Sequence, residues 1–406
     1  MRYQSDSNNI KLLIYAIHPI MYQAPIFSEL EDYKNSNLPW LDFTVYFGSK
    51  LSLKETYHHT FTSKFKNDYE DILRGYNFKF LKNFTLSEKE GFFSRINLGI
   101  IPKIMFGKYD VVLMHGYNTL TSIVILLSCL LSGKKIIFRG ESILRGDEDS
   151  LTFKNRLKII YLNIFLSLCD KVLYSCSGNK DFFLNYNVPI EKLIYIPCAV
   201  NNNFFQDNIK KLSPSIQDIK NSIGIKEKDL VISMCCSFTR RKRPIDLIKT
   251  AIEMNNENIF LLFIGDGPQK SLIHSELKNT SIRYHITGFL GQNQISKYYL
   301  ISDVSVVLSD YDPSPKAMNE AMNFSNCIIA THNVGTANDL IKKNHNGFII
   351  NAGDVSELKI ILTNLESNRD DVKNMGKRSL DIVSSFNYLE NAKAIEKAIV
   401  SIQENV

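Results

Sequence analysis

The chain has 406 residues, 44% of them hydrophobic and 22% charged, which is the composition of a globular protein long enough for two domains. No run reaches the ~20 apolar residues that a bilayer-spanning helix needs, and the polar start, Met1 to Asn9, precedes the first apolar run without a secretory signal. The net charge of +6 is compatible with a polyanionic ligand and with an anionic membrane surface, and does not distinguish between them. We expect no nucleic-acid partner.

Seven cysteines, an odd number, lie mostly in apolar segments and have no metal-ligand spacing: Cys129, Cys169, Cys176, Cys198, Cys235, Cys236 and Cys327. This pattern is typical of reduced, buried thiols, so we expect a cytoplasmic protein without disulfides or a metal site.

The first half alternates short apolar runs with helical segments, which predicts βαβ units and a parallel sheet. The expected strands are 11–16, 43–47, 78–81, 111–114, 135–138, 172–176 and 194–197. The first strand is followed by a polar and aromatic loop, Ile17 to Pro25, which includes His18 and Tyr22. We interpret this loop as a place where a ligand could enter.

Residues 50–94 form an irregular, aromatic and charged segment that contains the pair His58-His59. Adjacent residues of a strand point to opposite faces, and no third ligand has suitable spacing. Ligand recognition or plain surface is therefore expected rather than metal binding.

The strand at 111–114 leads into His115, and the strand at 135–138 leads into Arg139 and Glu141. Open α/β sheets bind ligands beyond the carboxyl ends of their strands, so these side chains are candidates for the rim of a ligand crevice. His115 is either packed or ligand-facing, and Arg139 and Glu141 either pair with each other or line the rim.

A basic amphipathic stretch follows at 154–168, where Lys154, Arg156 and Lys158 precede several Ile, Leu and Phe residues. It fits a helix on a membrane surface and equally a helix that faces the core.

Residues 206–228 are polar and lysine-rich with little periodicity, so we place a linker there between an N-terminal domain, 1–205, and a C-terminal domain, 229–385. Residues 386–406 are expected to form a helix that returns to the N-terminal domain. The second half repeats the βα alternation, with strands expected at 230–234, 260–264, 285–287, 304–308, 327–330 and 348–350.

Four consecutive bases, Arg240 to Arg243, follow the first strand of the second half and precede Pro244. They repel one another unless an anion bridges them, although a solvated charge run has the same composition. Glycine turns follow at Gly265-Asp266-Gly267-Pro268 and at Thr287-Gly288, each a weak signal alone.

The stretch 309–340 predicts a strand end, a turn and a helix with Ser314 as N-cap and Pro315 at its first position. Lys316 then lies in the first turn, where a cation is unfavourable unless an anion meets it. Asp312 and Glu320 add two carboxylates to a pocket with amide donors, unless this is an ordinary capped surface helix.

The string from Asp312 to Glu320, with Pro315 and Lys316, resembles the Glu-x7-Glu signature of retaining glycosyltransferases of family four, also called group 1. The passages at 239–244, 265–268 and 287–290 resemble that family in order, and the resemblance extends over nearly the whole chain. It implies the GT-B fold, in which two doubly wound Rossmann-like parallel-sheet domains face each other across a cleft.

The resemblance also implies residue roles. His115 and Asp312 contact the donor sugar, Lys242 holds the diphosphate with Arg240 or Arg241, and Glu320 holds the ribose. Further donor contacts are implied for Ser314, Lys316, Gly265, Gly267 and Gly288. The rim or the acceptor is expected to involve His18, Tyr22, Arg139 and Glu141, and acceptor recognition is also expected in residues 50–94. The chain departs from the family at Asp312, where a Glu is usual, and at Ser237, Asn201 and a missing diglycine near the first strand.

The implied activity is metal-independent, retaining transfer of a sugar from a UDP- or GDP-sugar to a glycan or lipid-linked acceptor, without a cofactor, in bacterial surface polysaccharide or lipopolysaccharide synthesis. Peripheral contact with the inner face of the cell membrane is expected with it. A sugar-nucleotide epimerase or hydrolase of the same fold and a non-catalytic nucleotide-sugar-binding module remain alternatives. An epimerase or hydrolase needs acid–base groups at the sugar, for which only His115 and Asp312 are available.

Overall fold

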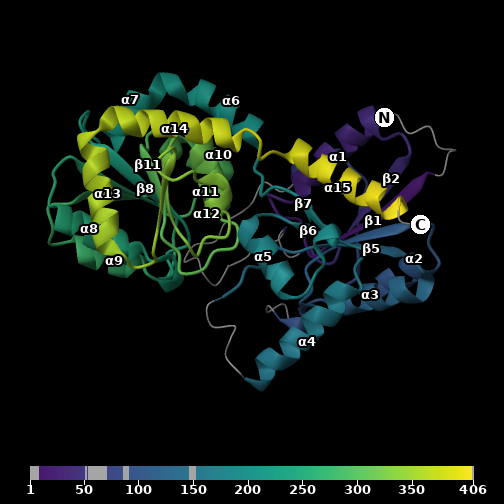
Figure 1. Ribbon diagram of the computed structural model, residues 1–406. Coiled ribbons are helices and arrows are strands. Elements are labelled where there is room, and N and C mark those ends of the chain that lie inside the picture. The colour runs from purple at the N-terminus through teal and green to yellow at the C-terminus, as the bar shows by residue number, and fades with distance from the viewer. Residues whose placement is uncertain (1–8, 51–52, 54–70, 86–90, 146–151, 405–406) are drawn as a thin grey trace. The chain divides into compact units, whose positions relative to one another are not determined.

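The computed structural model describes residues 9–50, 53, 71–85, 91–145 and 152–404. These residues form two compact units (Figure 1). Unit 1 contains the described residues up to Pro197 and from Tyr388 onward, and unit 2 contains those from Cys198 to Asn387. The pair His58-His59 lies outside the described residues.

Unit 1 is built on a parallel sheet of seven strands in the order β3-β2-β1-β4-β5-β6-β7. All seven strands expected in the first half are confirmed, with ends shifted by one or two residues. Their bounds are β1 Ile10–Ala16, β2 Leu41–Phe47, β3 Phe78–Phe80, β4 Val111–His115, β5 Lys135–Arg139, β6 Lys171–Tyr174 and β7 Leu193–Tyr195.

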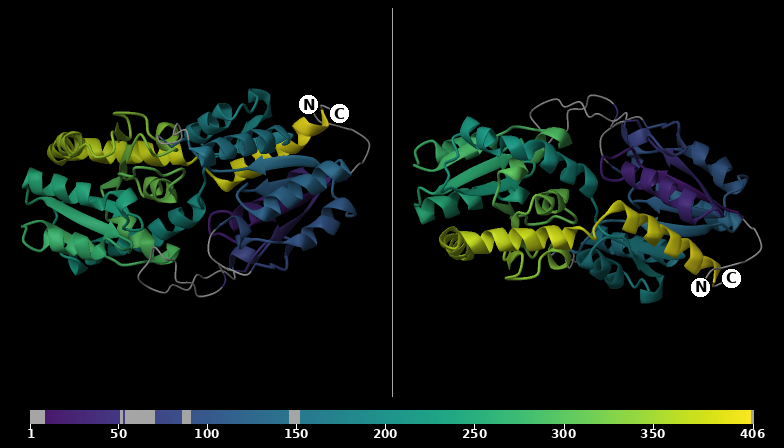
Figure 2. Two further views of the ribbon diagram at one scale, coloured as in Figure 1. Left: turned by 90° about the horizontal axis from the view of Figure 1, so that it is seen from below. Right: turned by 90° about the horizontal axis from the view of Figure 1, so that it is seen from above.

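Helices cover both faces of this sheet, as the continuous apolar strands require. One face packs against α2 (Ile101–Met105), α3 (Leu120–Ser132), α4 (Phe153–Ser167) and α5 (Ser177–Asn185), with Leu13, Val112 and Phe138 from the strands in the same core. The alternate residues of β1, such as Leu12 and Ile14, point to the other face. There α1 (Ala24–Asn37) and α15 (Tyr388–Gln403) lie side by side (Figure 2), and Tyr33 Oη donates to Glu396 Oε2 at 2.7 Å.

Unit 2 has a parallel sheet of six strands in the order β10-β9-β8-β11-β12-β13. The six strands expected in the second half are confirmed, again with small shifts at their ends. Their bounds are β8 Leu230–Cys235, β9 Ile259–Ile264, β10 Arg283–Ile286, β11 Val304–Val307, β12 Cys327–Thr331 and β13 Gly347–Ile350.

The helices of unit 2 also form two layers. One core contains residues of α8 (Pro244–Met254), α9 (Lys270–Leu277) and α13 (Val355–Ser367) with those of the strands. The other helices are α6 (Asn202–Leu212), α7 (Ile216–Ser222), α10 (Gln292–Leu300), α11 (Lys316–Asn323), α12 (Ala337–Leu340) and α14 (Arg369–Val383).

The expected linker at 206–228 is wrong. Most of this segment lies in α6 and α7, and the chain divides at Cys198 rather than after residue 205. The polar composition misled because α6 buries little more than Phe205, whose ring packs on Phe324 with centroids 5.7 Å apart. An amphipathic surface helix with one anchor of this kind resembles a linker in sequence.

The strand order reverses between β1 and β4 in unit 1 and between β8 and β11 in unit 2. Loops diverge at such a switch point, so the carboxyl ends of these strands are where a doubly wound sheet leaves room for a ligand. His115 ends β4, and the basic run and the loop before α11 follow β8 and β11.

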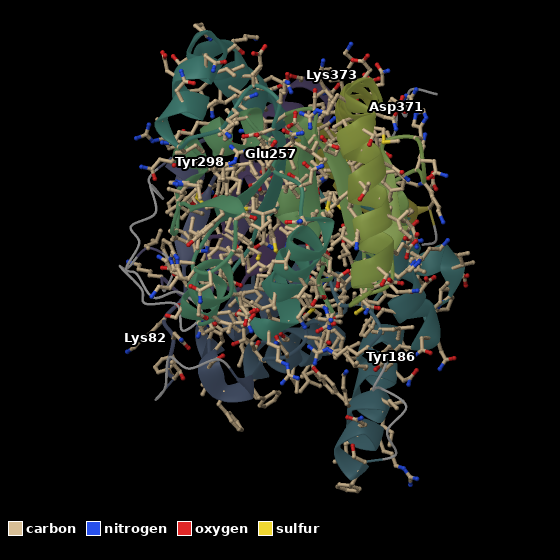
Figure 3. The ribbon with its side chains drawn as sticks, turned by 90° about the vertical axis from the view of Figure 1, so that its left-hand side faces the viewer. Lys82, Tyr186, Glu257, Tyr298, Asp371 and Lys373 are labelled. Carbon is tan, nitrogen blue, oxygen red and sulfur yellow. The ribbon has the colours of Figure 1, made fainter. Side chains whose placement is uncertain are left out.

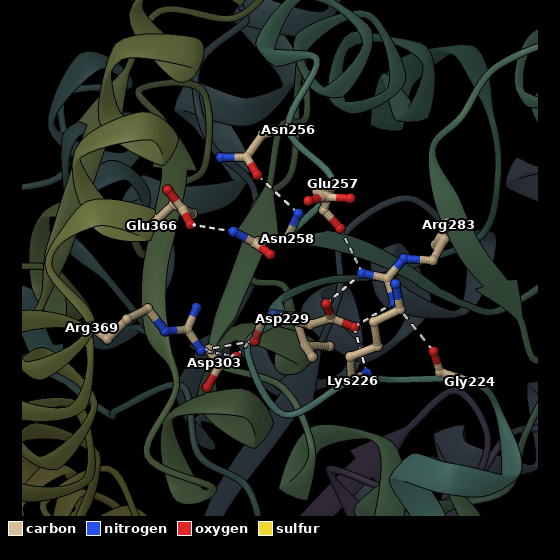
Figure 4. A network of polar contacts seen from close by, with 11 residues as sticks. Gly224, Lys226, Asp229, Asn256, Glu257, Asn258, Arg283, Asp303, Glu366 and Arg369 are labelled. Carbon is tan, nitrogen blue, oxygen red and sulfur yellow. Dashed lines mark hydrogen bonds and ion pairs between the residues drawn. The ribbon is translucent and has the colours of Figure 1, made fainter.

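The opposite, amino ends of the unit 2 strands are joined by a polar network (Figure 4). Asp229, just before β8, accepts from Arg283 Nη1 at 2.7 Å and from the Lys226 amide at 2.6 Å. Arg369 binds Asp303 Oδ2 at 3.0 Å, and Asp303 also accepts from the Val231 amide at 2.8 Å. The partnership with Asp229 raises the pKa of the Arg283 guanidinium. The network fixes the register of neighbouring strands from the end far from the candidate ligand site.

We expect Asp229→Asn to destabilise unit 2 by about 2–3 kcal/mol, because the Asp229 side chain is 1% exposed and the exchange removes a charged acceptor from Arg283. Urea unfolding followed by circular dichroism measures the change. The matched control is Asp370→Asn on α14, because Asp370 is 96% exposed and its partner Lys373 lies at the surface (Figure 3). The control is expected to change stability by less than about 0.5 kcal/mol, and an equally small change for Asp229→Asn would contradict the role of the network.

Candidate functional site

A buried ion pair joins the two loops at the switch point of unit 2. Lys242 Nζ donates to Asp312 Oδ2, and the two side chains are 13% and 11% exposed. The Asp312 backbone is held in place by the turn after β12, since its amide donates to Asn333 O at 3.1 Å and its carbonyl accepts from Gly335 at 2.9 Å. The lysine expected to hold the diphosphate and one of the two predicted carboxylates are therefore in contact, a pairing that the sequence analysis did not predict.

The other bases of the run have separate surroundings. Arg243 donates to Asp246 Oδ2 at 2.5 Å and to Asp310 Oδ1 at 2.9 Å, and these acids raise the pKa of its guanidinium. Arg241 donates to the Tyr311 carbonyl, and both Arg240 and Arg241 are exposed. Mutual repulsion within the run is thus relieved in part by acidic residues, so an anion is not required to hold Arg243.

The two predicted glycine turns meet each other. Gly265 and Gly288 form a β-bridge, and the Gly265 amide donates to Thr287 Oγ1 at 3.3 Å. Gly265 has φ +137°, and a Cβ there would lie 2.1 Å from the Cys236 carbonyl oxygen, so glycine is required for the close approach of the β8 loop. A Cβ on Gly267 would lie 2.6 Å from the Phe238 amide.

The expected start of the site helix is wrong by one residue. α11 begins at Lys316, Pro315 is its N-cap, and Ser314 does not cap it. Instead Ser314 Oγ accepts from Lys316 Nζ at 2.9 Å, and the same ammonium donates to Cys198 Sγ at 2.9 Å. A positive charge is unfavourable at the first turn of a helix. The hydrogen bonds to Ser314 and Cys198 offset this cost for the ammonium of Lys316.

Glu320, the second predicted carboxylate, lies within α11 and is 2% exposed. Its Oε2 accepts from the hydroxyl of Tyr299, on α10, at 2.9 Å. Tyr299 is fully buried, and its ring stacks on Phe324 with centroids 5.8 Å apart. Tyr299 therefore fixes the position of the Glu320 carboxylate.

Several buried hydroxyls near these loops have no hydrogen-bond partner among the described residues: Thr239, Ser309 and Thr336. They follow the carboxyl ends of β8, β11 and β12. A buried hydroxyl without a partner costs free energy, so such groups at a strand end favour a polar ligand that pairs with them.

In unit 1 the residue that ends β4, His115, is buried and its ring Nδ1 contacts the side-chain amide of Gln23. Burial lowers the pKa of His115 to about 3, with a further lowering by Arg139 and an opposing effect of Glu141. The imidazole is therefore neutral at physiological pH. If Gln23 donates to Nδ1, the proton lies on Nε2, which has no partner among the described residues.

The other candidates of unit 1 lie near the same strand ends. Arg139 is buried and lies 3.4 Å from Glu141, so the two do pair, and Arg139 is opposite His115 in the β4–β5 register. His18 and Tyr22 are half-buried in the loop after β1. This loop is shorter than expected, because α1 already begins at Ala24.

Sequence reasoning missed three residues that position the candidates: Gln23, Tyr299 and Cys198. Gln23 carries a weak signal, since it lies in the loop singled out after the first strand. Tyr299 and Cys198 carry none, because each meets its partner across more than twenty residues of sequence without a motif. Within the described ranges, no three His, Cys, Asp or Glu side chains are grouped as a metal site requires, and none of the helices there is long and apolar enough to cross a membrane.

Residues 215–381 match the family described as "Glycosyl transferases group 1". The chain is 25% identical over 45% of its length to an N-acetyl-alpha-D-glucosaminyl L-malate synthase of Bacillus anthracis, and this match covers 47% of that protein. It is 23% identical over 52% of its length to an alpha-1,4-N-acetyl-D-galactosaminyltransferase of Campylobacter jejuni whose name includes a PP-undecaprenol-linked glycan, with 56% of that protein covered. The chain thus spans about half the length of these relatives.

Among solved structures, the fold is similar to that of Anabaena HepE in complex with UDP. The TM-score is 0.71 at 14% identity, and the match covers 97% of this chain and 100% of the other. The expected fold of two doubly wound parallel-sheet domains is confirmed, and the resemblance to group 1 glycosyltransferases is confirmed for residues 215–381.

We expect Tyr299→Phe to lower the free energy of unfolding by about 1–3 kcal/mol, because it leaves the buried Glu320 oxygen without this donor. The control is Tyr284→Phe, whose hydroxyl lies 3.3 Å from His274 Nδ1 at an exposed position and is expected to matter little. In the Glu320→Gln background the cost of Tyr299→Phe should shrink, which denaturant unfolding of the double mutant measures. Equal costs in both backgrounds would show that the contribution of the hydroxyl does not depend on the charge of Glu320.

The lowered pKa of His115 predicts a pH dependence of unit 1. In the unfolded chain His115 has its ordinary pKa of 6.5, and in the folded protein a pKa of about 3, so between these values the unfolded state binds more protons. The stabilisation is complete above pH 6.5 and is lost as the pH falls toward 3, at about 1.4 kcal/mol per pH unit. Denaturant unfolding between pH 7 and about 4.5 should therefore show a steeper loss for the wild type than for His115→Gln. Parallel curves would contradict a buried neutral imidazole.

Proposed function

Because residues 215–381 match the family described as "Glycosyl transferases group 1", we propose that this protein is a retaining glycosyltransferase. It moves a sugar from a UDP- or GDP-sugar to a glycan or lipid-linked acceptor. The observation that carries the proposal is the Lys242–Asp312 ion pair at the switch point of unit 2, close to the exposed bases Arg240 and Arg241.

The donor diphosphate is assigned to these bases. As the bond to the anomeric carbon breaks, negative charge grows on the leaving phosphate, and fixed cations and amides aimed at that charge lower the barrier. Lys242 supplies a largely buried cation. Arg240 and Arg241, which precede it in the chain, add two exposed cations. Their charges offer the neutralisation that a metal ion otherwise provides, so we propose transfer without a metal or cofactor.

The nucleoside and sugar are assigned to the remaining residues. Glu320, held by Tyr299, suits the ribose hydroxyls, because an anchored carboxylate accepts two hydrogen bonds in a fixed direction. The turns at Gly265, Gly267 and Gly288 bring backbone close enough to meet the base. Asp312 is proposed to bind the transferred sugar. The contact of His115 with the sugar is proposed from the family resemblance alone.

The acceptor and pathway are proposed from the relatives. The Campylobacter jejuni relative is named for a PP-undecaprenol-linked glycan, and the Bacillus anthracis relative for a glucosaminyl malate. A lipid-linked acceptor in bacterial surface polysaccharide or lipopolysaccharide synthesis agrees with the first. Such an acceptor places the protein at the inner face of the cell membrane, where its seven free cysteines stay reduced.

A panel of nucleotide diphosphates and nucleotide sugars without metal tests this function by thermal shift. A nucleotide held at 100 times its dissociation constant stabilises the folded protein by about 2.7 kcal/mol. We expect one donor to raise the melting temperature of the wild type and of the controls Lys249→Ala and Glu276→Gln, which change exposed residues of unit 2. It should shift neither Lys242→Ala nor Glu320→Gln, each measured against its own unliganded baseline.

If every nucleotide leaves a folded wild type unchanged, the transferase proposal is wrong. A nucleotide sugar that binds and is epimerised or hydrolysed without any acceptor identifies the corresponding alternative enzyme. Binding without turnover over a broad acceptor panel favours the non-catalytic module. Retention is read from the anomeric configuration of the product by NMR.

A further inference from the structure

Exposed apolar side chains concentrate in one part of unit 1. Of the 23 large hydrophobic residues that are exposed in the described part of the chain, 15 lie between Phe84 and Leu168, about a fifth of the sequence. Single exposed apolar residues are ordinary, whereas a contiguous group marks an interaction surface. This concentration therefore indicates a surface that binds a partner.

The centre of the group is a stripe along α4. Phe153, Leu157, Ile160 and Ile164 are 77%, 50%, 56% and 57% exposed. Their spacing of four, three and four residues places them on one face of the helix. The free end of α4, which carries Phe153, extends beyond the rest of unit 1 (Figure 1).

The opposite face of α4 is firmly attached. Leu162, Phe165 and Leu166 are buried in the core, and the Tyr161 hydroxyl donates to the Tyr117 carbonyl at 2.6 Å. The stripe therefore cannot turn inward without dissolving this packing. The core-facing interpretation of 154–168 is correct for one face of the helix and leaves the other face open.

The neighbouring helix α3 extends the apolar surface. Leu127, Leu130 and Leu131 are 52%, 45% and 77% exposed. The inner residues of α3, such as Ile125 and Cys129, share one core cluster with those of α4 on the same face of the sheet. The outer faces of the two helices therefore point to the same side of unit 1.

The charges on these helices have a single sign. α3 contains no charged residue, and α4 contains Lys154, Arg156 and Lys158 without any Asp or Glu. In an isologous dimer the same patch contacts itself, so bases of one copy would meet bases of the other. An anionic bilayer complements both features, because its headgroups attract the bases and its acyl boundary receives the apolar stripe.

We infer that the outer face of α3 and α4 binds the surface of an anionic lipid bilayer, with α4 lying in the plane of the interface. This deepens the proposed function and rests on it in one respect, since a lipid-linked acceptor is what requires the enzyme at a membrane. The surface lies in unit 1, and the bases and carboxylates assigned to the nucleotide lie in unit 2, so the two can be tested separately.

Vesicle flotation of the full chain tests the inference, with phosphatidylcholine vesicles alone or with about one third phosphatidylglycerol. We expect the wild type to float with the anionic vesicles and much less with the neutral ones, and to be released as salt rises. The triple variant Leu157→Gln, Ile160→Gln, Ile164→Gln should bind at least about tenfold more weakly. Arg156→Gln with Lys158→Gln should lose roughly fivefold for each charge.

The matched control is the triple variant Ile252→Gln, Leu272→Gln, Ile360→Gln, which removes three exposed apolar side chains of unit 2 at 40%, 40% and 62% exposure. It should float like the wild type. Loss of binding in this control, or wild-type binding by the α4 variants, would overturn the assignment to this surface. A wild type that ignores vesicles and forms a dimer abolished by the α4 triple variant would identify a second copy as the partner instead.

Folding of each variant is verified by its unfolding curve and by the nucleotide thermal shift. An α4 triple variant that retains the nucleotide shift and loses vesicle binding supports the inference. If the wild type shows the nucleotide shift but never binds vesicles, the inference fails while the proposed function stands. If the wild type binds vesicles but no nucleotide, the proposed function fails while the assignment of the membrane-binding surface stands.

Discussion

The ion pair between Lys242 and Asp312 is the interaction on which the candidate site of unit 2 depends. It joins two loops that leave the sheet on either side of the switch point, and it removes both charges largely from water. Desolvation of such a pair is expensive, so its geometry must be imposed by what surrounds it. The turn around Asn333 holds Asp312, and the polar network around Asp229 holds the strands at their other ends. The loops that carry the site are therefore anchored to strands whose register is fixed.

The same ion pair would affect how the diphosphate of a donor binds at this site. Without a ligand, Lys242 is neutralised by Asp312, and Arg243 by Asp246 and Asp310. A diphosphate that approaches this region competes with carboxylates for Lys242 and finds Arg240 and Arg241 exposed. Exchange of one anionic partner for another changes the local charge less than the capture of a bare cation would. In the proposed function, this exchange would release Asp312 from Lys242 and leave its carboxylate available to the sugar.

The strands were predictable because buried parallel strands such as β4 and β9 are continuous apolar runs between polar turns. The positions of the candidate site residues were predictable where these residues followed the strands, and their roles stay predictions. The start of α11 was not, because Ser314 and Pro315 fit two adjacent cap positions equally well and the contacts of Lys316 with Cys198 decide between them. Tyr299 was not either, since the bond from α10 to Glu320 depends on how two helices pack, which local patterns do not record.

The pairing of α1 with α15 has a consequence for how the protein is made. Tyr33 near the start of the chain bonds to Glu396 near its end, and the residues of unit 2 lie between them in the sequence. On the ribosome, unit 2 is fully synthesised before α15 is made. Until then, the face of the unit 1 sheet that α15 covers stays exposed. Ile395, Ile399 and Ile402 are buried only once α15 has been synthesised. Nascent chains of this topology expose an apolar sheet face longest at their first-made end, which is where chaperone binding during synthesis is to be sought.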